Sequence, residues 1–84
     1  MFVLIEKALA SKGRIKILKL LLHEKELNIS EIGRRVKLPH KSVNLHLKVL
    51  KEANLVEEEK VGRIRIFKVK ESRKSKILEE LFKN

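Results

Sequence analysis

Apolar residues recur at helical spacing in the first third of the chain. Within residues 8–24 they fall at Leu9, Ile15, Leu18, Leu21 and Leu22. This spacing lines one side of a helix, and the hydroxyl of Ser11 suits its N-cap. The pattern therefore predicts an amphipathic helix. Residues 3–9 are too apolar to face water, and they either join this helix or form a short one of their own.

A second and a third helix are expected in quick succession. Ser30 is a suitable N-cap, and Glu31 in the first turn complements the positive end of the helix dipole. Leu38 precedes Pro39 and is disfavoured in the α region, so the second helix ends there, whereas proline fits the first turn of the next helix. The pattern predicts a short helix, a tight turn and a third helix over about residues 40–53.

The third expected helix has two unlike faces when its residues are placed at about 100° steps. The face that turns toward the core carries Val43, Leu47 and Leu50. The opposite face carries Lys41, Leu45 and Lys48. A helix with this distribution packs on one side and presents cations on the other.

Two runs follow, over residues 55–60 and 63–70, and Gly62 marks a reversal between them. The second run is rich in β-branched and aromatic residues at near-alternating positions. This pattern predicts a β-hairpin. With a two-residue loop, the expected cross-strand pairs are Lys60 with Arg63, Glu58 with Arg65, and Val56 with Phe67.

A last helix is expected after Ser72, which can serve as its cap. Its apolar stripe consists of Ile77, Leu78, Leu81 and Phe82. The chain contains no repeat, linker or low-complexity tract, so we expect residues 1–84 to form a single domain.

The order of helix, helix, turn, helix, hairpin and helix is the pattern of a winged helix. Residues 29–56 resemble the core of an ArsR-like winged helix-turn-helix regulator, most specifically in residues 42–50 and 53–56 and in the wing signal Gly62-Arg63. The resemblance covers about residues 8–70. It implies a mainly α fold with a β-hairpin wing, in the order α-α-α-β-β-α, that binds double-stranded DNA.

Two positions bear on the helix-turn-helix that this resemblance implies. Gly33 stands where such families have a small side chain, so that the third helix lies close; a mid-helix glycine otherwise costs about 1 kcal/mol relative to alanine. Lys37 departs from the family, which often has glycine at this turn. We therefore expect Lys37 to adopt a less favourable backbone angle, or the turn to differ.

The chain has 84 residues, with 21 lysines and arginines against 11 acidic residues, and a formal net charge of +10. The electrostatic field of a chain with this net charge attracts polyanions, and nucleic acid is the natural partner. The abundance of Lys, Glu, Ile and Leu, without Gln, Thr, Asp or Tyr, resembles archaeal or thermophile proteins, and we attribute about half of the charge density to that bias. Heat adaptation enriches Glu along with Lys, so it does not explain the excess of basic over acidic residues.

The outer face of the third helix supplies the candidate base-reading residues. They are His40, Lys41, Ser42, Asn44, Leu45 and Lys48. Asn44 suits adenine, Lys41 suits guanine, and Leu45 suits the thymine methyl group. Each of these side chains taken alone fits an ordinary solvated helix surface equally well, although an exposed leucine beside lysines is harder to explain in that way.

A second set of cations is expected to contact the DNA backbone. Arg63 and Arg65 at the hairpin tip would reach the backbone or the minor groove, and Arg34, Arg35 and Lys51 would contact phosphates. The acidic run at residues 57–59 would repel the phosphate backbone, and we expect its carboxylates to pair with the basic side chains of the hairpin.

The chain has no cysteine, which excludes disulfides, thiolate catalysis and the cysteine metal site of many ArsR-like sensors. The imidazoles are His23, His40 and His46, and no His/Glu pair at ligand spacing is repeated. We expect no metal, no cofactor, no small-molecule effector and no enzymatic activity, and a half-buried position for His46. The apolar run at the start is too short for a signal sequence or a membrane span, so we expect a soluble, cytoplasmic protein without membrane contact.

These observations predict a homodimeric transcriptional regulator that acts as a repressor. The core of so small a chain is marginal, and a second copy would add buried surface. The first and last helices would form the interface through Val3, Leu4, Ile5, Ile77, Leu78, Leu81 and Phe82. The two third helices would then lie in successive major grooves about 34 Å apart. Two alternatives are an architectural, sequence-indifferent chromatin-type protein and a protein or RNA interaction module.

Overall fold

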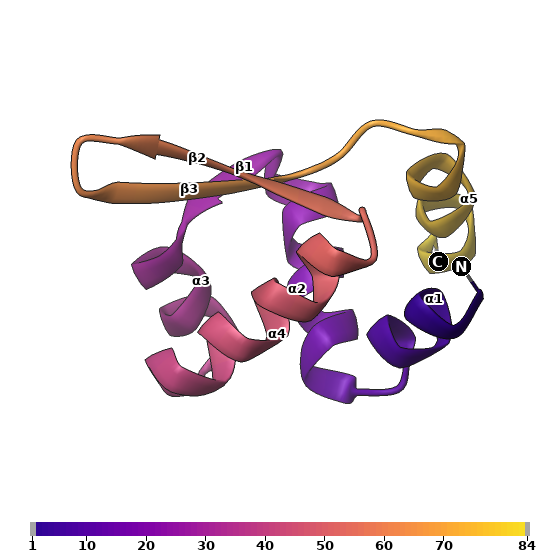
Figure 1. Cartoon of the computed structure of the whole chain (residues 1–84), viewed down its shortest axis with the longest axis horizontal. Helices are drawn as coiled ribbons and strands as arrows, with labels where there is room; N and C mark the ends of the chain where they lie inside the picture. Colours follow the sequence, from indigo (N-terminus) through magenta and orange to yellow (C-terminus); the bar gives the residue numbers. More distant parts are fainter. Residues whose placement is uncertain (1, 84) are drawn as a thin grey trace.

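The computed structural model describes the backbone of residues 2–83 and the side chains of residues 6–83. The elements follow one another as α1 (Phe2–Leu9), α2 (Lys12–Glu24), β1 (Glu26–Asn28), α3 (Ile29–Val36), α4 (His40–Glu52), β2 (Val56–Val61), β3 (Ile64–Val69) and α5 (Arg73–Phe82). This order confirms the mainly α fold with a β-hairpin wing. It adds the short strand β1, and it makes the first apolar residues a helix of their own. In Figure 1 the wing tip and α5 lie at opposite ends of the molecule.

Helices α2, α3 and α5 begin at capping side chains, two of which are those expected. The Ser11 hydroxyl accepts a hydrogen bond from the Arg14 backbone N–H at 3.4 Å, and the Ser72 hydroxyl caps α5. The cap expected at Ser30 is wrong. Asn28 caps α3 instead: its Oδ1 accepts from the Glu31 N–H at 2.9 Å, and the Glu31 carboxylate accepts from the Asn28 N–H at 3.1 Å. This capping box satisfies two free donors at once.

The expected hairpin is present, but its register is wrong by two residues. Val61 pairs with Ile64 around the turn, and the predicted partners of Glu58 and Val56 are replaced by Phe67 and Val69. Gly62 follows Val61 with φ of 64°, which a two-residue hairpin turn requires at its first position. Because a shift of two keeps every side chain on its face, the inward and outward positions are unchanged.

The three strands form an antiparallel sheet in the order β1-β3-β2, so β3 is the central strand. Strand β1 pairs with β3 through Glu26 with Lys68, Leu27 with Phe67, and Asn28 with Ile66. Asn28 is thus the last paired residue of β1 and also the cap of α3. The base of the wing is tied directly to the helix-turn-helix.

The core confirms the inner face expected for the third helix. Val43, Leu47 and Leu50 of α4 are fully buried, and they belong to the same apolar cluster as Leu18 and Phe67. This burial anchors α4 by one side, which leaves its opposite side toward solvent.

The turn between α3 and α4 has the strained geometry expected at its lysine. Lys37 lies in the left-handed region with φ of 59° and ψ of 46°. A Cβ atom on Gly33 would lie 3.5 Å from the Leu38 carbonyl oxygen and 3.8 Å from Val43 Cγ2, which are ordinary contact distances. Residue 33 therefore has room for a side chain as small as that of alanine, and the packing of α4 onto α3 requires only that this side chain be small.

Replacement of Lys37 by glycine should stabilise the fold by about 0.5 to 1 kcal/mol, because glycine adopts the left-handed region without the Cβ penalty. Urea denaturation measures the change. The matched control is Lys48→Gly on the exposed face of α4, which should destabilise by about 1 kcal/mol. Equal losses in the two variants would contradict the claim that Lys37 is strained.

Candidate nucleic-acid interface

The outer face of α4 is open to solvent. His40, Lys41, Asn44, Leu45 and Lys48 are exposed, and Ser42 is half-buried. Leu45 is 59% exposed, although most other large apolar side chains of the helix-turn-helix are buried. The helix therefore presents two lysines, an amide and one leucine on the side away from the core.

Asn44 is joined to the wing. Its Oδ1 accepts a hydrogen bond from Arg65 Nη1 at 2.8 Å. The same guanidinium donates to the Glu58 carboxylate through Nε at 2.6 Å and through Nη2 at 3.3 Å, and it lies 5.2 Å from the centre of the Phe67 ring. Glu58 also accepts from Lys51 Nζ at 2.8 Å. A connected network thus links α4 to both strands of the wing.

The Glu58 carboxyl is the centre of this network, with a side chain only 8% exposed. The pKa of this carboxyl is lowered to about 2, mainly by the hydrogen bonds from Arg65; burial acts in the opposite direction, and Lys51 adds to the lowering. The ion pair between Glu58 and Arg65 was expected from the sequence. It forms in spite of the register error, because the two residues are diagonal neighbours on one face of the hairpin.

The network corrects part of the expected set of phosphate contacts. Arg65 is not at the hairpin tip; its side chain is 32% exposed and is held by Glu58 and Asn44. Lys51 is paired with Glu58, and Arg35 pairs with Glu24 at 2.9 Å. These cations are engaged within the chain because acidic side chains lie within reach of each, so they are weaker candidates for phosphate contact.

Arg34 and Arg63 are exposed, and neither has an ion pair within residues 6–83. Both line an open groove of about 360 Å³ between the start of α3 and the wing. The other residues around it are Asn28, Ile29, Ser30, Ile64 and Arg65. Of the expected backbone set, Arg34 and Arg63 are the two whose guanidinium groups remain available.

The acidic run of the wing is neutralised in part, as expected. Glu58 is paired with Arg65 and Lys51, and Glu57 lies 3.5 Å from Lys68 Nζ. Glu59 is exposed and has no ion pair in the described part of the wing. The repulsion that this run exerts on a polyanion is therefore much smaller than the sequence alone indicates.

His46 is half-buried on α4, as expected, and it packs against Gly13 of α2. A Cβ atom on Gly13 would lie 2.8 Å from His46 Nε2, so the close approach of the two helices depends on this glycine. Sequence reasoning missed the contact, and only the unexplained glycine in the first turn of α2 could have indicated it. Burial, and secondarily the charge of Arg14, lowers the pKa of His46 below its ordinary value of 6.5.

Acidification should destabilise the fold through His46. Because the pKa of His46 is lowered in the folded chain, the unfolded chain binds more protons below pH 6.5. The stabilising effect is complete above that pH and is lost as the pH falls from 6.5 toward the folded pKa. Urea midpoints measured between about pH 7 and about pH 5 should decrease, and less steeply in His46→Gln. Identical slopes in the two proteins would contradict this role.

The expected dimer residues are placed unequally. Ile77 and Leu81 of α5 are 56% and 68% exposed. Leu78 is buried in the core of its own chain, which leaves little of it for a partner to contact. Phe82 is half-buried, with Lys19 Nζ 5.3 Å from its ring centre. The side chains of Val3, Leu4 and Ile5 lie outside the described residues.

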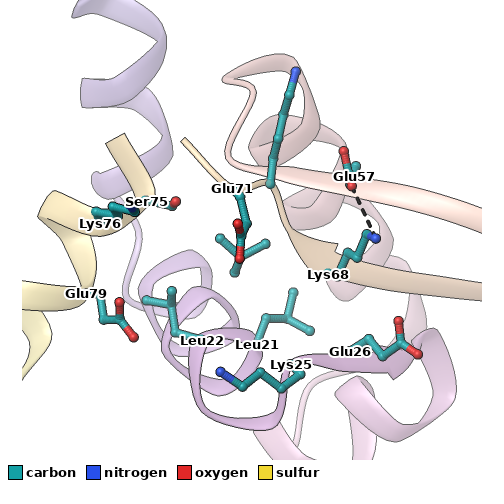
Figure 2. Close-up of a pocket in the computed structure, with 12 residues that line it drawn as sticks. Leu21, Leu22, Lys25, Glu26, Glu57, Lys68, Glu71, Ser75, Lys76 and Glu79 are labelled. Atoms are coloured by element: carbon teal, nitrogen blue, oxygen red, sulfur yellow. Dashed lines mark ion pairs between the residues drawn. The ribbon is translucent and has the colours of Figure 1, made fainter. Parts of the chain in front are cut away.

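A larger groove of about 780 Å³ lies away from the outer face of α4, between the end of α2, the base of the sheet and α5 (Figure 2). Its floor includes Leu21 and Leu22, and its rim alternates lysines with glutamates. The groove has no excess of either charge to select an ionic ligand.

Within the described residues there is no group of three or more potential metal-ligating side chains. No helix in that part of the chain is long and apolar enough to cross a membrane.

The sequence profile described as bacterial regulatory protein, arsR family, matches residues 11–58, more than half of the chain. The chain belongs to the ArsR family. The match contains α2, β1, α3, α4 and the start of the wing, and it confirms the resemblance seen in the sequence. As a member of the ArsR family, the protein is a DNA-binding transcriptional regulator. The comparison with curated proteins gives no match.

Solved structures show the same fold. HlyU from Vibrio cholerae is 28% identical, with a TM-score of 0.84 over 94% of this chain and 85% of that one. The transcriptional repressor PagR of Bacillus anthracis is 25% identical, with a TM-score of 0.77 over 89% and 85%. The homodimeric winged helix-turn-helix DNA-binding domain Mb0332 from Mycobacterium bovis is 22% identical, with a TM-score of 0.86 over 95% and 73%.

Proposed function

We propose that the protein is a homodimeric repressor that binds double-stranded DNA sequence-specifically, with α4 in the major groove and the wing tip on the backbone or in the minor groove. The observation that carries the proposal is the two-sided character of α4. Its apolar side is buried, and its opposite side exposes Lys41, Asn44, Leu45 and Lys48. The major groove admits one helix, and side chains of these types match base edges and the thymine methyl group.

The charge of the chain supports the same mode of binding. The net charge of +10 favours association with a polyanion, and Arg34 and Arg63 are the exposed arginines nearest to the groove between α3 and the wing. We assign these two to phosphate contacts, which orient the protein without reading sequence. A regulator of this kind acts where the DNA is, and we place it in the cytoplasm.

The dimer is proposed from an exposed apolar pair. Ile77 and Leu81 lie one helical turn apart on α5, and both are more than half exposed. Helices α1 and α5 both pack near α2 at the end of the molecule away from the wing tip (Figure 1). A two-fold contact there would leave both copies of α4 free for successive major grooves. The structural neighbour Mb0332 is itself homodimeric.

Replacement of Leu81 by glutamate should convert the dimer to a monomer, because two carboxylates would face each other across an apolar contact. Sedimentation at micromolar concentration measures the change. Glu80→Leu, on the neighbouring exposed position, is the matched control and should stay dimeric. A monomeric wild-type protein, or a dimeric Leu81→Glu variant, would contradict this interface.

Selection of bound duplexes from a random pool tests the function directly. A sequence-specific regulator keeps a preferred duplex in the presence of excess random DNA. An architectural protein would show no preference, and a protein or RNA interaction module would fail to retain duplex DNA or would favour single-stranded RNA. Either of those outcomes would replace the proposed function.

A further inference from the structure

The guanidinium of Arg65 is fixed on three sides. Its Nε and Nη2 face the nearly buried carboxylate of Glu58, and its plane lies over the fully buried ring of Phe67. Lys51 holds the same carboxylate from the side of α4. The remaining donor edge, at Nη1, points to Asn44 at 2.8 Å. Arg65 is thus a fixed donor placed beside a candidate base-reading residue.

This placement determines which end of the Asn44 amide faces outward. A guanidinium only donates hydrogen bonds, so the amide atom beside Nη1 must be the oxygen. The amide nitrogen, with its two N–H groups, is therefore the end turned away from Arg65. Without the arginine, the amide would be free to rotate by 180° and present either a donor or an acceptor.

We propose that Arg65 is a positioning residue for sequence recognition: it orients Asn44 so that a hydrogen-bond donor faces the DNA. The inference rests on the proposed function, in which Asn44 contacts a base edge. In the major groove, purine N7, guanine O6 and thymine O4 accept a hydrogen bond, whereas cytosine offers only its N4 donor. Asn44 held in this way accepts adenine, guanine or thymine at its contact and rejects cytosine.

The wing has a specificity role that does not require it to touch DNA at this residue. Glu58 fixes Arg65, and Arg65 fixes Asn44, so the hairpin acts on the base contact through α4. Arg63 has no such positioning role: it is exposed on the same hairpin and has no ion pair within the described residues. Arg63 is therefore the matched control.

The test compares wild type, Arg65→Lys, Asn44→Asp and Arg63→Ala on duplexes that differ at the base pair whose preference Asn44→Ala relaxes. Wild type should bind the acceptor bases about tenfold or more tightly than cytosine. Arg65→Lys keeps a cation beside Glu58 but loses the fork, and its discrimination should fall below about threefold. Asn44→Asp keeps an acceptor for Arg65 and turns an acceptor outward, so it should favour cytosine. Arg63→Ala should weaken all duplexes equally and keep the preference.

A measurement on the free protein distinguishes the positioning of Asn44 by Arg65 from base reading by Asn44 itself. NMR relaxation of the Asn44 side-chain amide should show an ordered group in wild type and in Arg63→Ala, and a mobile one in Arg65→Lys. Full cytosine discrimination in Arg65→Lys, or an equally ordered amide, would overturn the positioning role alone. A uniform loss across all duplexes in Arg65→Lys would make Arg65 a phosphate contact and also overturn it. A wild-type protein without any base preference would overturn the base reading itself.

Discussion

Simultaneous replacement of Lys41 and Lys48 by glutamate should lower the affinity for duplex DNA at least about 100-fold, because each chain exchanges two cations for two anions at the proposed contact. Both lysines are exposed on the outer face of α4, and neither has an ion pair within residues 6–83. The fold should be retained, since neither side chain contributes to the core. Fluorescence anisotropy with a labelled duplex at fixed salt measures the loss.

The matched control is Lys25→Glu with Lys70→Glu, which changes the net charge by the same amount. Both lysines are exposed and line the large groove near α5, away from the outer face of α4. If overall charge alone drives binding, the two double variants should weaken it equally. The proposal requires the α4 variant to lose much more, and equal losses would show that α4 has no special position at the DNA.

Replacement of Glu58 by glutamine should lower the free energy of unfolding by about 2 to 3 kcal/mol, because a nearly buried carboxylate that pairs with two cations is lost. For a domain of this size the melting temperature should fall by about 10 °C or more. Glu59→Gln is the control, since Glu59 is exposed and unpaired within the described wing. Calorimetry at one protein concentration measures both.

The same carboxyl should give the fold a step of acid sensitivity. The pKa of Glu58 is lowered from 4.5 to about 2 in the folded chain, so the unfolded chain binds the proton first. The stabilising effect is therefore present above pH 4.5 and lost as the pH falls from 4.5 to about 2. Stability should vary less across that range in Glu58→Gln. An equally steep loss in the variant would assign the acid sensitivity to other groups.

Much of the fold followed from the sequence because it depends on local patterns. The buried side of α4, the caps at Ser11 and Ser72 and the left-handed Lys37 each reflect residue types within one or two turns. Strand β1 was missed because three residues are too few to show alternation. The register was missed because the position of Gly62 in the turn, rather than charge pairing, decides it.

The site was less predictable because its contacts join distant parts of the chain. Side chains of the right type on α4 could be identified from helical geometry, but Arg65 and Asn44 are 21 residues apart, and their contact depends on how the wing packs on α4. The engagement of Lys51 and Arg35 has the same origin. Likewise, Leu78 and Ile77 differ in burial although both belong to one apolar stripe, because α2 covers only part of α5.

The double use of Asn28 couples the base of the wing to the start of α3. A swing of the hairpin would pull β1 with it and disturb the capping box, so we expect the base of the hairpin and α3 to move together. In the proposed complex we therefore expect the distance between the DNA contact of α4 and that of the wing to vary little. A target with a different groove spacing has to supply the adjustment by its own curvature, which costs least where pyrimidine–purine steps fall between the contacts.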